Sequence, residues 1–470
     1  MIIHVFIFSN PLNFNLIIFL YSYNHIIANL RNSFMDEMLY RVVAFTGFFI
    51  ISFIAWLTGN KDQINQKTIL GSIFLAWSLG GMIFWLPLTR QALEWLNNVL
   101  ISVLQASQKG SIFLFGPLAI GPGEFLSDGT QSTGFILALQ VLPSVIFFSA
   151  IISLLYYLNV IQTCVNGFAK FFYKTMALSG AESFSAAASI FFGIESSLTI
   201  RKYLDRMSQS ELLTLITCMM STVATTVMAV YVIALKEVFP QIAGHLISAS
   251  IISIPCAILI SKLSLPENKS PQTLGSVSND ITEEIFTNNA IDINTKKPTN
   301  VMVVLMEGGA LGVKLAISIA TLLIIILGLQ EIVDLILNLI PKIFGQPISI
   351  NRIFGWIVWP FTLFIGLKPD EWEMGSQILG SRFIETEVSS YFQLAAIQSN
   401  QIQAFSLRSF TALTYTLCGF VHLASLGIFI GGLTAIIPSR AKEISILGLR
   451  GLWTAFLSTL LTGSIAGALA

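Results

Sequence analysis

Long runs of apolar residues, separated by short polar segments, extend through most of the sequence. A membrane-spanning helix needs about 20 consecutive and mostly apolar residues. Runs of this kind cover residues 39–57, 68–87, 134–158, 212–235, 245–263, 311–329, 411–437 and 448–469. The pattern therefore predicts an all-α, polytopic membrane protein with about eight transmembrane helices.

The N-terminal segment differs from these spans. Residues 1–34 are apolar and contain no acidic residue, and Arg31 is their one basic residue. Because Arg31 lies late, the segment lacks the basic start that is typical of a signal peptide. We expect residues 1–38 to be an N-terminal extension, which either adds a helix or is not native, the chain then beginning at Met35.

An amphipathic segment follows the second span. Residues 88–106 place Leu93 and Leu100 on one helical face and Arg90 and Glu94 on the other. A helix of this kind buries its apolar face at the membrane surface. The segment is therefore predicted to be an interfacial helix.

A polar segment divides the rest of the chain. Residues 264–300 contain eight of the fifty Asp, Glu, Lys and Arg residues and are rich in Ser, Thr and Asn, which is typical of a linker. The predicted organisation is N-terminal scaffold helices with the interfacial helix at 39–133, a first core half at 134–263, the linker at 264–300 and a second core half at 301–470.

Two apolar stretches in corresponding positions of the two halves contain charged residues. They cover residues 167–200 and 348–397, and each is long enough to enter and leave the membrane on one side. We therefore expect two re-entrant helical hairpins in repeat-related halves. The span after each stretch is interrupted by polar residues, at 221–226 and 422–425.

Paired interruptions of this kind are the sequence sign of a secondary transporter with a site near the membrane midplane. Unwound backbone at membrane depth exposes polar groups that lipid cannot satisfy, so it persists where it lines a cavity or contacts a ligand. The two interrupted spans are therefore predicted to bind the substrate or an ion.

Composition supports the membrane assignment and excludes several functions. Hydrophobic residues make up 54% of the chain and charged residues only 11%, against about 25% in soluble domains, and the formal net charge is zero. This excludes an ordinary soluble protein, and a neutral chain lacks the basic surface that nucleic acid would need. No metalloprotease, hydrolase, P-loop or dinucleotide motif is present. We therefore expect no enzymatic activity, and transport driven by an ion gradient.

Ionisable residues inside the apolar stretches are the candidates for function. A charged side chain at the bilayer centre costs about 2.5 to 3.5 kcal/mol on insertion scales, so such residues usually have a role. Glu195 and Glu387 are the two leading candidates, with His422 as a third. The alternative for the two acids is an internal ion pair that stabilises the bundle.

Three other charged residues have a structural interpretation. We expect Glu182 and Arg382 to form ion pairs that hold the bundle together. Glu385 is as readily interpreted as a turn residue exposed to water as a site residue. The hydroxyls of the interrupted spans are weaker signals, because Ser and Thr commonly bond to their own helix.

Several motifs then resemble a known family. They are QVLPSVIFFSAIISLLYYLNVIQ (140–162), SGAESFSAAASIF, IRKYL with SQSEL, GSRFIETEVSSY, and CGFVHLASLGIFIGG followed by IPSR. From about residue 134 to the C-terminus, the chain closely resembles the concentrative nucleoside transporters. The resemblance implies a homotrimer of eight-helix protomers, with hairpins that carry the substrate against a fixed scaffold. It also implies cotransport of nucleosides with sodium or protons.

The resemblance also implies substrate-binding residues, with departures from the family pattern. Glu195 corresponds to the acid that reads the nucleobase, but Ile194 replaces the preceding Gln. Glu387 corresponds to the acid that accepts hydrogen bonds from the ribose, and His422 replaces an Asn that helps to bind the ribose. The implied substrate-binding set is Gly193, Ile194, Glu195, Val227, Glu387, Phe420, His422 and Ser425.

A sodium site is implied between the first hairpin and the first interrupted span. Its ligands would be Ser189, the Phe192 carbonyl, Thr222 and the Val223 carbonyl, with Ser189 in place of an Asn. An alignment without a gap would instead put Ala188 at that position. The resemblance therefore implies sodium as the coupling ion, or a proton where the weakened site does not hold sodium.

The sequence thus predicts ion-driven nucleoside import by an elevator-like, alternating-access mechanism in an integral, multi-pass protein of the inner or plasma membrane. Two alternatives stay open. One is a divergent symporter for a modified nucleoside or a nucleobase, which Ile194 and His422 favour. The other is a non-transporting membrane scaffold or gate protein.

Overall fold

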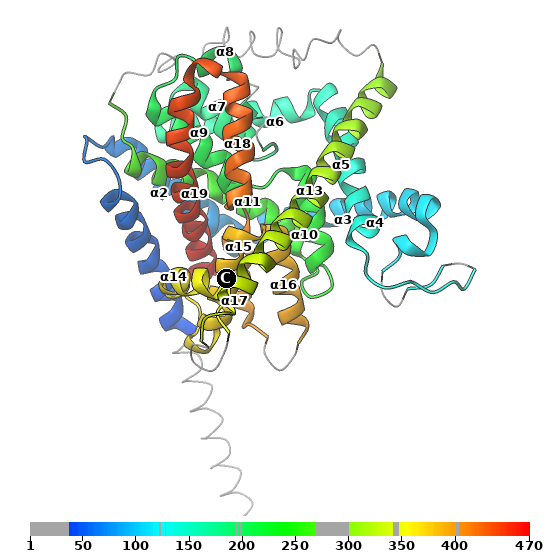
Figure 1. Cartoon of the computed structure of the whole chain (residues 1–470). Helices are drawn as coiled ribbons and strands as arrows, with labels where there is room; N and C mark the ends of the chain where they lie inside the picture. The colour runs from blue at the N-terminus through cyan, green and yellow to red at the C-terminus, as the bar shows by residue number, and fades with distance from the viewer. Residues whose placement is uncertain are drawn as a thin grey trace, which may run out of the picture.

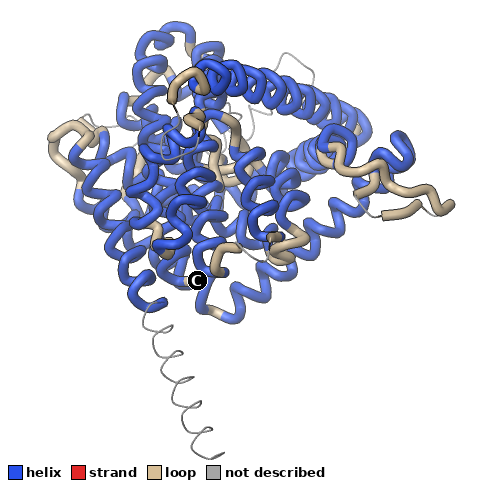
Figure 2. The backbone as a smooth tube through the Cα atoms, turned by 60° about the horizontal axis from the view of Figure 1, so that its bottom comes forward, coloured by secondary structure: helices blue, strands red, loops and turns tan. Residues whose placement is uncertain are grey.

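The computed structural model describes residues 37–121, 124–126, 128–193, 196–197, 200–268, 300–341, 347–400 and 404–470, without the side chains of Arg201 and Lys202. Within these ranges the chain forms helices and loops, and no strand is present (Figures 1 and 2). Eight described helical segments are long and apolar enough to cross a membrane. The prediction of an all-α, polytopic membrane protein is therefore confirmed.

The first half of the described chain begins with a helix at Glu37–Leu57, drawn in dark blue in Figure 1. The helices that follow are α2 (Gln66–Trp85), α3 (Pro87–Phe115), η1 (Gly116–Ala119), α4 (Leu137–Gln140), α5 (Leu142–Tyr157), α6 (Val160–Met176), α7 (Gly180–Ala188), α8 (Arg201–Leu204), α9 (Gln209–Ser221), α10 (Thr225–Leu235) and α11 (Ile242–Ser264).

The second half begins after residue 300. Its helices are α13 (Val301–Leu337), α14 (Ile350–Phe364), η3 (Pro369–Glu371), α15 (Trp372–Ile384), α16 (Glu387–Ser399), α17 (Leu407–Leu417), α18 (Leu423–Ile436), η4 (Pro438–Arg440) and α19 (Ala441–Leu469).

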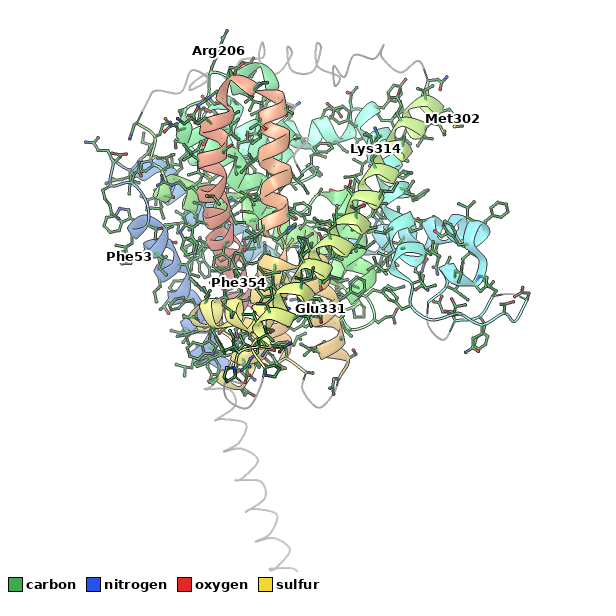
Figure 3. All side chains as sticks on the ribbon, in the orientation of Figure 1. Phe53, Arg206, Met302, Lys314, Glu331 and Phe354 are labelled. Atoms are coloured by element: carbon green, nitrogen blue, oxygen red, sulfur yellow. The ribbon has the colours of Figure 1, made fainter. Side chains whose placement is uncertain are left out.

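One long helix of the second half packs along a helix of the first half. Helix α13 packs along α5, and Figure 3 shows Met302, Lys314 and Glu331 spaced along it. Gly308 and Gly312 allow the close approach, since a Cβ at Gly312 would lie 2.6 Å from the Cα of Ile146 on α5. Small residues four apart are a usual basis of helix pairing in membranes.

The buried centre surrounds α19. This helix packs against α9, α11 and α17, and most of its second half is buried. Hydroxyl pairs join it to its neighbours: Thr217 of α9 and Thr454 are 2.7 Å apart, and Ser253 of α11 and Thr462 are 3.0 Å apart. Such pairs satisfy polar side chains that lipid could not.

Local sequence explains where the central helices begin. Helix α9 starts with a capping box, in which the Ser208 hydroxyl accepts from the Glu211 amide and the Glu211 carboxylate accepts from the Ser208 amide. Ser179 caps α7 and Thr386 caps α16. These side chains satisfy amides that a helix start leaves free.

The two predicted hairpin stretches are shorter in the structure than we expected. In the first, α6 continues to Met176, so the segment that folds back begins with α7 at Gly180. In the second, residues 350–364 form a separate helix, α14, and the hairpin consists of α15 and α16 joined by Glu385 and Thr386. The prediction treated adjacent helices as one stretch, because they are all apolar and only short turns separate them.

The predicted span at 411–437 is split. Helix α17 ends at Leu417 and α18 begins at Leu423, so the segment contains two short helices on either side of a break. The segment 411–437 is therefore not among the eight described helical segments that are long and apolar enough to span a membrane. Pro87–Ala119 is among them instead, and it includes the predicted interfacial helix and extends it. Whether α3 lies in the interface stays a prediction.

Two other predictions fall outside the described residues. Residues 1–36, which make up nearly all of the predicted N-terminal extension, are not described, and neither are residues 269–299 of the predicted linker.

Candidate functional site

The two interrupted helices meet at their breaks. Residues 222–224 separate α9 from α10, and residues 418–422 separate α17 from α18. Gly419, in the second break, packs directly against the backbone at the first break. A Cβ on Gly419 would lie 2.9 Å from the Met220 carbonyl oxygen and 2.9 Å from the Ser221 carbonyl carbon. Only a glycine permits this contact. The structure therefore brings both interruptions to one point, although the second lies at 418–422, earlier than the predicted 422–425.

Glu387 lies beside this crossing, in the first turn of α16, and is 3% exposed. Its Oε1 accepts a hydrogen bond of 2.7 Å from the Tyr231 hydroxyl of α10. Its Oε2 lies 2.9 Å from Nε2 of His422. Apart from this close contact, Oε2 has no hydrogen-bond partner among the described residues, so this carboxylate oxygen retains acceptor capacity.

The state of His422 follows from its other nitrogen. His422 caps α18, and its Nδ1 accepts a 3.0 Å hydrogen bond from the Ser425 amide. A neutral imidazole carries one proton, so a ring whose Nδ1 accepts has that proton on Nε2. The imidazole N–H therefore faces the Glu387 carboxylate, and both ring nitrogens are engaged.

Ser425 and Phe420 complete this side of the break. The Ser425 hydroxyl donates to the carbonyls of Phe420, at 2.6 Å, and His422, at 2.7 Å. Phe420 is half-buried, and its ring lies 6.1 Å from that of Phe429. The structure thus brings Glu387, Phe420, His422 and Ser425 together from hairpin 2 (α15 and α16) and the second break.

The other predicted substrate-binding residues are not among the direct contacts that the structure describes for Glu387. Val227 is buried on α10, one turn before Tyr231, and these two side chains share a helical face. Gly193 is buried in the turn after α7. Ile194 and Glu195 lie outside the described residues.

Tyr231 is a site residue that the sequence reasoning missed. It lies in the apolar run of α10 and is fully buried, yet its hydroxyl reaches Glu387, 156 positions away. The sequence did contain a sign of this role, because the hydroxyl of a tyrosine inside a membrane span needs a hydrogen-bond partner. The spacing of four from Val227 also placed Tyr231 on the predicted site face.

The first break contacts the predicted sodium ligands. Thr222 donates to the Ser189 carbonyl at 2.8 Å and to the Cys218 carbonyl at 2.9 Å. The Thr225 amide donates to the Phe191 carbonyl at 3.1 Å. The turn after α7 is therefore bonded directly to the first break, next to the Phe192 and Val223 carbonyls.

Several oxygens at this break have no described donor. Helix α9 ends at Ser221, and the carbonyls of Met219, Met220 and Ser221 accept no hydrogen bond from the described residues. The Ser221 hydroxyl is fully buried and also has no partner there. Neutral oxygens grouped in this way suit a hard cation such as sodium.

The three charged residues with a structural interpretation, Glu182, Arg382 and Glu385, differ in their partners. Glu182 forms the expected ion pair, with Lys262 of α11 at 2.7 Å. Arg382 forms no ion pair with a described carboxylate and instead donates to backbone carbonyls of the second break. That prediction was wrong because a helix end can supply the acceptors for a buried cation.

Glu385 is also not the water-exposed turn residue of one interpretation. It is 3% exposed and accepts hydrogen bonds from Asn351 at 2.6 Å, from Gln393 at 2.8 Å and from Ser389. These partners lie on α14 and α16, so Glu385 holds hairpin 2 to the preceding helix.

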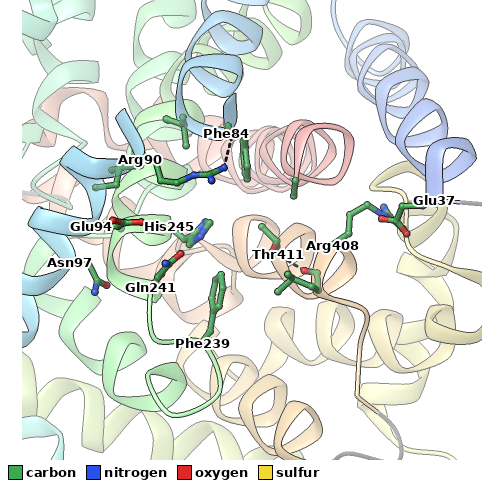
Figure 4. A pocket seen from close by; sticks show the side chains of 15 residues that line it. Glu37, Phe84, Arg90, Glu94, Asn97, Phe239, Gln241, His245, Arg408 and Thr411 are labelled. Carbon is green, nitrogen blue, oxygen red and sulfur yellow. Dashed lines mark hydrogen bonds and ion pairs between the residues drawn. The ribbon is translucent and has the colours of Figure 1, made fainter. Parts of the chain in front are cut away.

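A separate cavity of about 450 Å³ is shown in Figure 4. Arg90, Glu94, His245 and Thr411 line it, from α3, α11 and the first turn of α17. None of the described residues that we predicted for substrate lines it. The cavity is therefore distinct from the cluster around Glu387.

Three family models match the chain. Residues 46–118 match the "Na+ dependent nucleoside transporter N-terminus", residues 138–237 match "Nucleoside recognition" and residues 245–467 match the "Na+ dependent nucleoside transporter C-terminus". Together the matches cover most of the described chain, including both breaks and hairpin 2.

Individual proteins agree with these matches. The nucleoside permease NupC of Helicobacter pylori is 30% identical over 426 residues, which is 90% of this chain and 96% of that protein. The solved structure of CNTnw in an inward-facing, substrate-bound state covers 92% of this chain and 98% of its own, with a TM-score of 0.80 and 28% identity. A CNTnw variant in an outward-facing state gives the same values.

The order of these matches follows the order of the motifs along the chain. The eight apolar helical segments and the two breaks agree with the same assignment. This integral, multi-pass membrane protein belongs to the concentrative nucleoside transporter family.

Proposed function

We propose that this protein imports nucleosides across a membrane by coupling their movement to an ion gradient, with sodium as the coupling ion. Family membership supports the substrate class. The observation that carries the proposal is the Glu387 cluster, where a buried carboxylate, a histidine and a helix break converge.

The carboxylate suits a sugar. An ionised carboxylate has about four acceptor positions, and Tyr231 uses one of those on Oε1. The remaining positions, above all on Oε2, can accept hydrogen bonds from ribose hydroxyls. Such charge-assisted bonds are roughly twice as strong as neutral ones. Glu387 would therefore bind the ribose.

Sodium binding at the first break would complete the coupling. A cation there would be coordinated by the free carbonyls of α9 and by hydroxyl oxygens, among them that of Thr222. The same cation would tie the turn after α7 to the break. Since Gly419 joins the two breaks, ion binding at the first would stabilise the substrate site at the second.

Transport would follow an elevator-like, alternating-access mechanism. The hairpins and the broken helices would move together, as a rigid unit, against α5 and α13. The likeness to both inward-facing and outward-facing CNTnw supports such a cycle. The proposed assembly is a homotrimer, in which the apolar exposed face of α13 would contact a neighbouring subunit or lipid.

A second candidate has its own support. Both nitrogens of His422 are engaged, so the ring offers the sugar no free polar atom. With Ile194 in place of the family's Gln, this favours a modified nucleoside or a nucleobase as substrate. In this second candidate, the contact between His422 and Glu387 would suit a proton as the coupling ion.

Uptake into proteoliposomes tests these proposals. The purified protein is supplied with radiolabelled uridine or adenosine, and sodium and proton gradients are imposed separately. We expect concentrative uptake with an inward sodium gradient and little without it. Uptake that follows only the proton gradient would replace sodium by a proton.

Competition then tests the substrate class. Unlabelled nucleosides should inhibit uptake more strongly than free bases or ribose. If no nucleoside is taken up, competes or stabilises the folded protein against heat, the nucleoside assignment is wrong, because a ligand that binds only the folded state must stabilise it.

A further inference from the structure

Arg382 is a buried cation whose partners are backbone carbonyls. It lies in the last turn of α15, in hairpin 2, and is 1% exposed. One terminal nitrogen donates to the Thr416 carbonyl at 2.6 Å, and the other donates to the Gly419 carbonyl at 2.8 Å. A buried charge without a paired acid needs such strong acceptors.

The position of these acceptors is specific. The last four carbonyls of a helix have no partner within it, and α17 ends at Leu417. In α17 all four carbonyls accept a hydrogen bond. The Thr414 carbonyl accepts from the Tyr391 hydroxyl, and the Thr416 carbonyl accepts from Arg382. The Tyr415 and Leu417 carbonyls accept from the amides of Cys418 and Gly419. Hairpin 2 supplies two of the four donors, through Arg382 and Tyr391.

The guanidinium also joins three elements. Besides the Thr416 and Gly419 carbonyls, it donates to the Thr459 hydroxyl of α19 at 3.2 Å. The end of α17 carries the negative partial charge of a helix C-terminus, which a cation stabilises. Arg382 therefore satisfies the charge and the hydrogen bonds of the second break together.

Among the described side chains, none plays the equivalent part at the first break. The carbonyls of Met219, Met220 and Ser221 at the end of α9 receive no donor from the described residues. A mobile cation would satisfy them, whereas at the second break a side chain already does so. Each break thus presents the same chemical requirement, a positive charge among carbonyls.

We propose that Arg382 acts as a tethered cation at the second break, and that it positions Glu387 against His422 by tying hairpin 2 to the end of α17. Arg382 does not touch the substrate in this scheme and is a positioning residue. Its effect on substrate affinity rests on the proposed role of Glu387, but its cation role does not.

The test compares charge and shape at position 382. Arg382→Lys keeps a cation that can reach carbonyls, whereas Arg382→Gln keeps a donor without the charge, and Arg382→Ala removes both. We expect the KM for nucleoside uptake to rise about tenfold or more in Arg382→Gln and in Arg382→Ala, since charged hydrogen bonds are lost. Arg382→Lys should recover most of that loss. Equal KM values for the Lys and Gln variants would overturn the proposal.

Chemical rescue separates the tethered-cation role from general packing. Detergent-purified Arg382→Ala is heated in a few millimolar guanidinium chloride, with sodium or potassium chloride at equal ionic strength as the reference. We expect guanidinium to raise the Tm of this variant and not of the wild type. No rise would overturn the proposal.

Arg408→Ala is the matched control. Arg408 is also buried and donates to a backbone carbonyl, that of Gly366, but it lies at the start of α17 and pairs with Glu37. We expect this variant to lose stability with an unchanged KM. A KM increase equal to that of Arg382→Ala would show a general packing effect and contradict the proposal.

If Arg382→Ala does not fold, the Lys and Gln variants decide the question. If the wild type does not bind nucleosides, the Tm of these variants with and without guanidinium still tests the cation role. Failure of the proposed function and failure of this inference are therefore distinguishable.

Discussion

The two helix breaks pack against each other but satisfy their backbone differently. At the second break, every carbonyl of the last turn of α17 has a donor, and Arg382 supplies a fixed positive charge. At the first break, three carbonyls at the end of α9 and the Ser221 hydroxyl have no partner among the described residues. Among the described residues, one break is complete within the protein, and the other keeps carbonyl oxygens that the proposed sodium ion would coordinate.

This difference suggests a division of labour. A transporter needs one site where a cation binds reversibly and another where the substrate meets a preformed surface. In our proposal, the fixed cation at the second break holds Glu387 and His422 in place before the substrate arrives. Preorganised groups lose less freedom on binding.

The largest expected effect comes from removing the charge of Glu387. Glu387→Gln keeps the shape of the side chain but converts one acceptor oxygen into a donor. Since charge-assisted hydrogen bonds to the substrate are lost, nucleoside uptake in proteoliposomes should fall about 100-fold. Glu385→Gln, a change at the other buried acid of the hairpin tip, should leave the KM close to that of the wild type. Unaltered uptake by Glu387→Gln would disprove the ribose role.

Breaking the contact between the two breaks should have the next largest effect. In Gly419→Ala a methyl group would meet the Met220 and Ser221 backbone at 2.9 Å, and overpacking of this kind costs about 1 to 3 kcal/mol. We expect a lower Tm together with weaker stimulation of uptake by sodium. Gly427→Ala in α18 is the control, because a Cβ there meets nothing within 4 Å. Equal Tm values for the two variants would show that the contact is unimportant.

The sodium role of the first break can be tested at Thr222. Thr222→Val removes an oxygen that lies against the Ser189 carbonyl, and we expect the sodium concentration for half-maximal uptake to rise about tenfold. Thr217→Val is the control, because the Thr217 hydroxyl, on helix α9, pairs with Thr454 of α19. That variant should lose stability without a change in sodium dependence, and a parallel change in both variants would argue against a site at Thr222.

The smallest effect is expected at the cap of α18. In His422→Asn the new amide can still accept from the Ser425 amide and donate toward Glu387, and Asn is a good N-cap residue. The free energy of unfolding should therefore change by less than about 1 kcal/mol, whereas His422→Leu should lose more. Thermal unfolding of the two variants in detergent measures this. Equal losses would show that the cap does not depend on a polar side chain.

The helical architecture could be predicted from the sequence to a large extent. Runs of about 20 apolar residues mark spans because lipid requires them, and polar residues within two spans marked the breaks. The boundaries inside 167–200 and 348–397 could not be predicted, since α6 and α14 are as apolar as the hairpins next to them. The acids at 182, 385 and 387 were visible as ionisable residues, but their different partners were not.

What the sequence by itself determined is the class of protein, the family, and the approximate positions of the spans and of the two breaks. These follow from local composition and from motifs of consecutive residues. Only the tertiary structure decided that Tyr231 meets Glu387, that Arg382 reaches the end of α17 and that Gly419 lies on Ser221. Each of these contacts joins residues far apart in the chain, and helix packing, rather than any local pattern, sets which polar groups remain unsatisfied and which side chain can reach them.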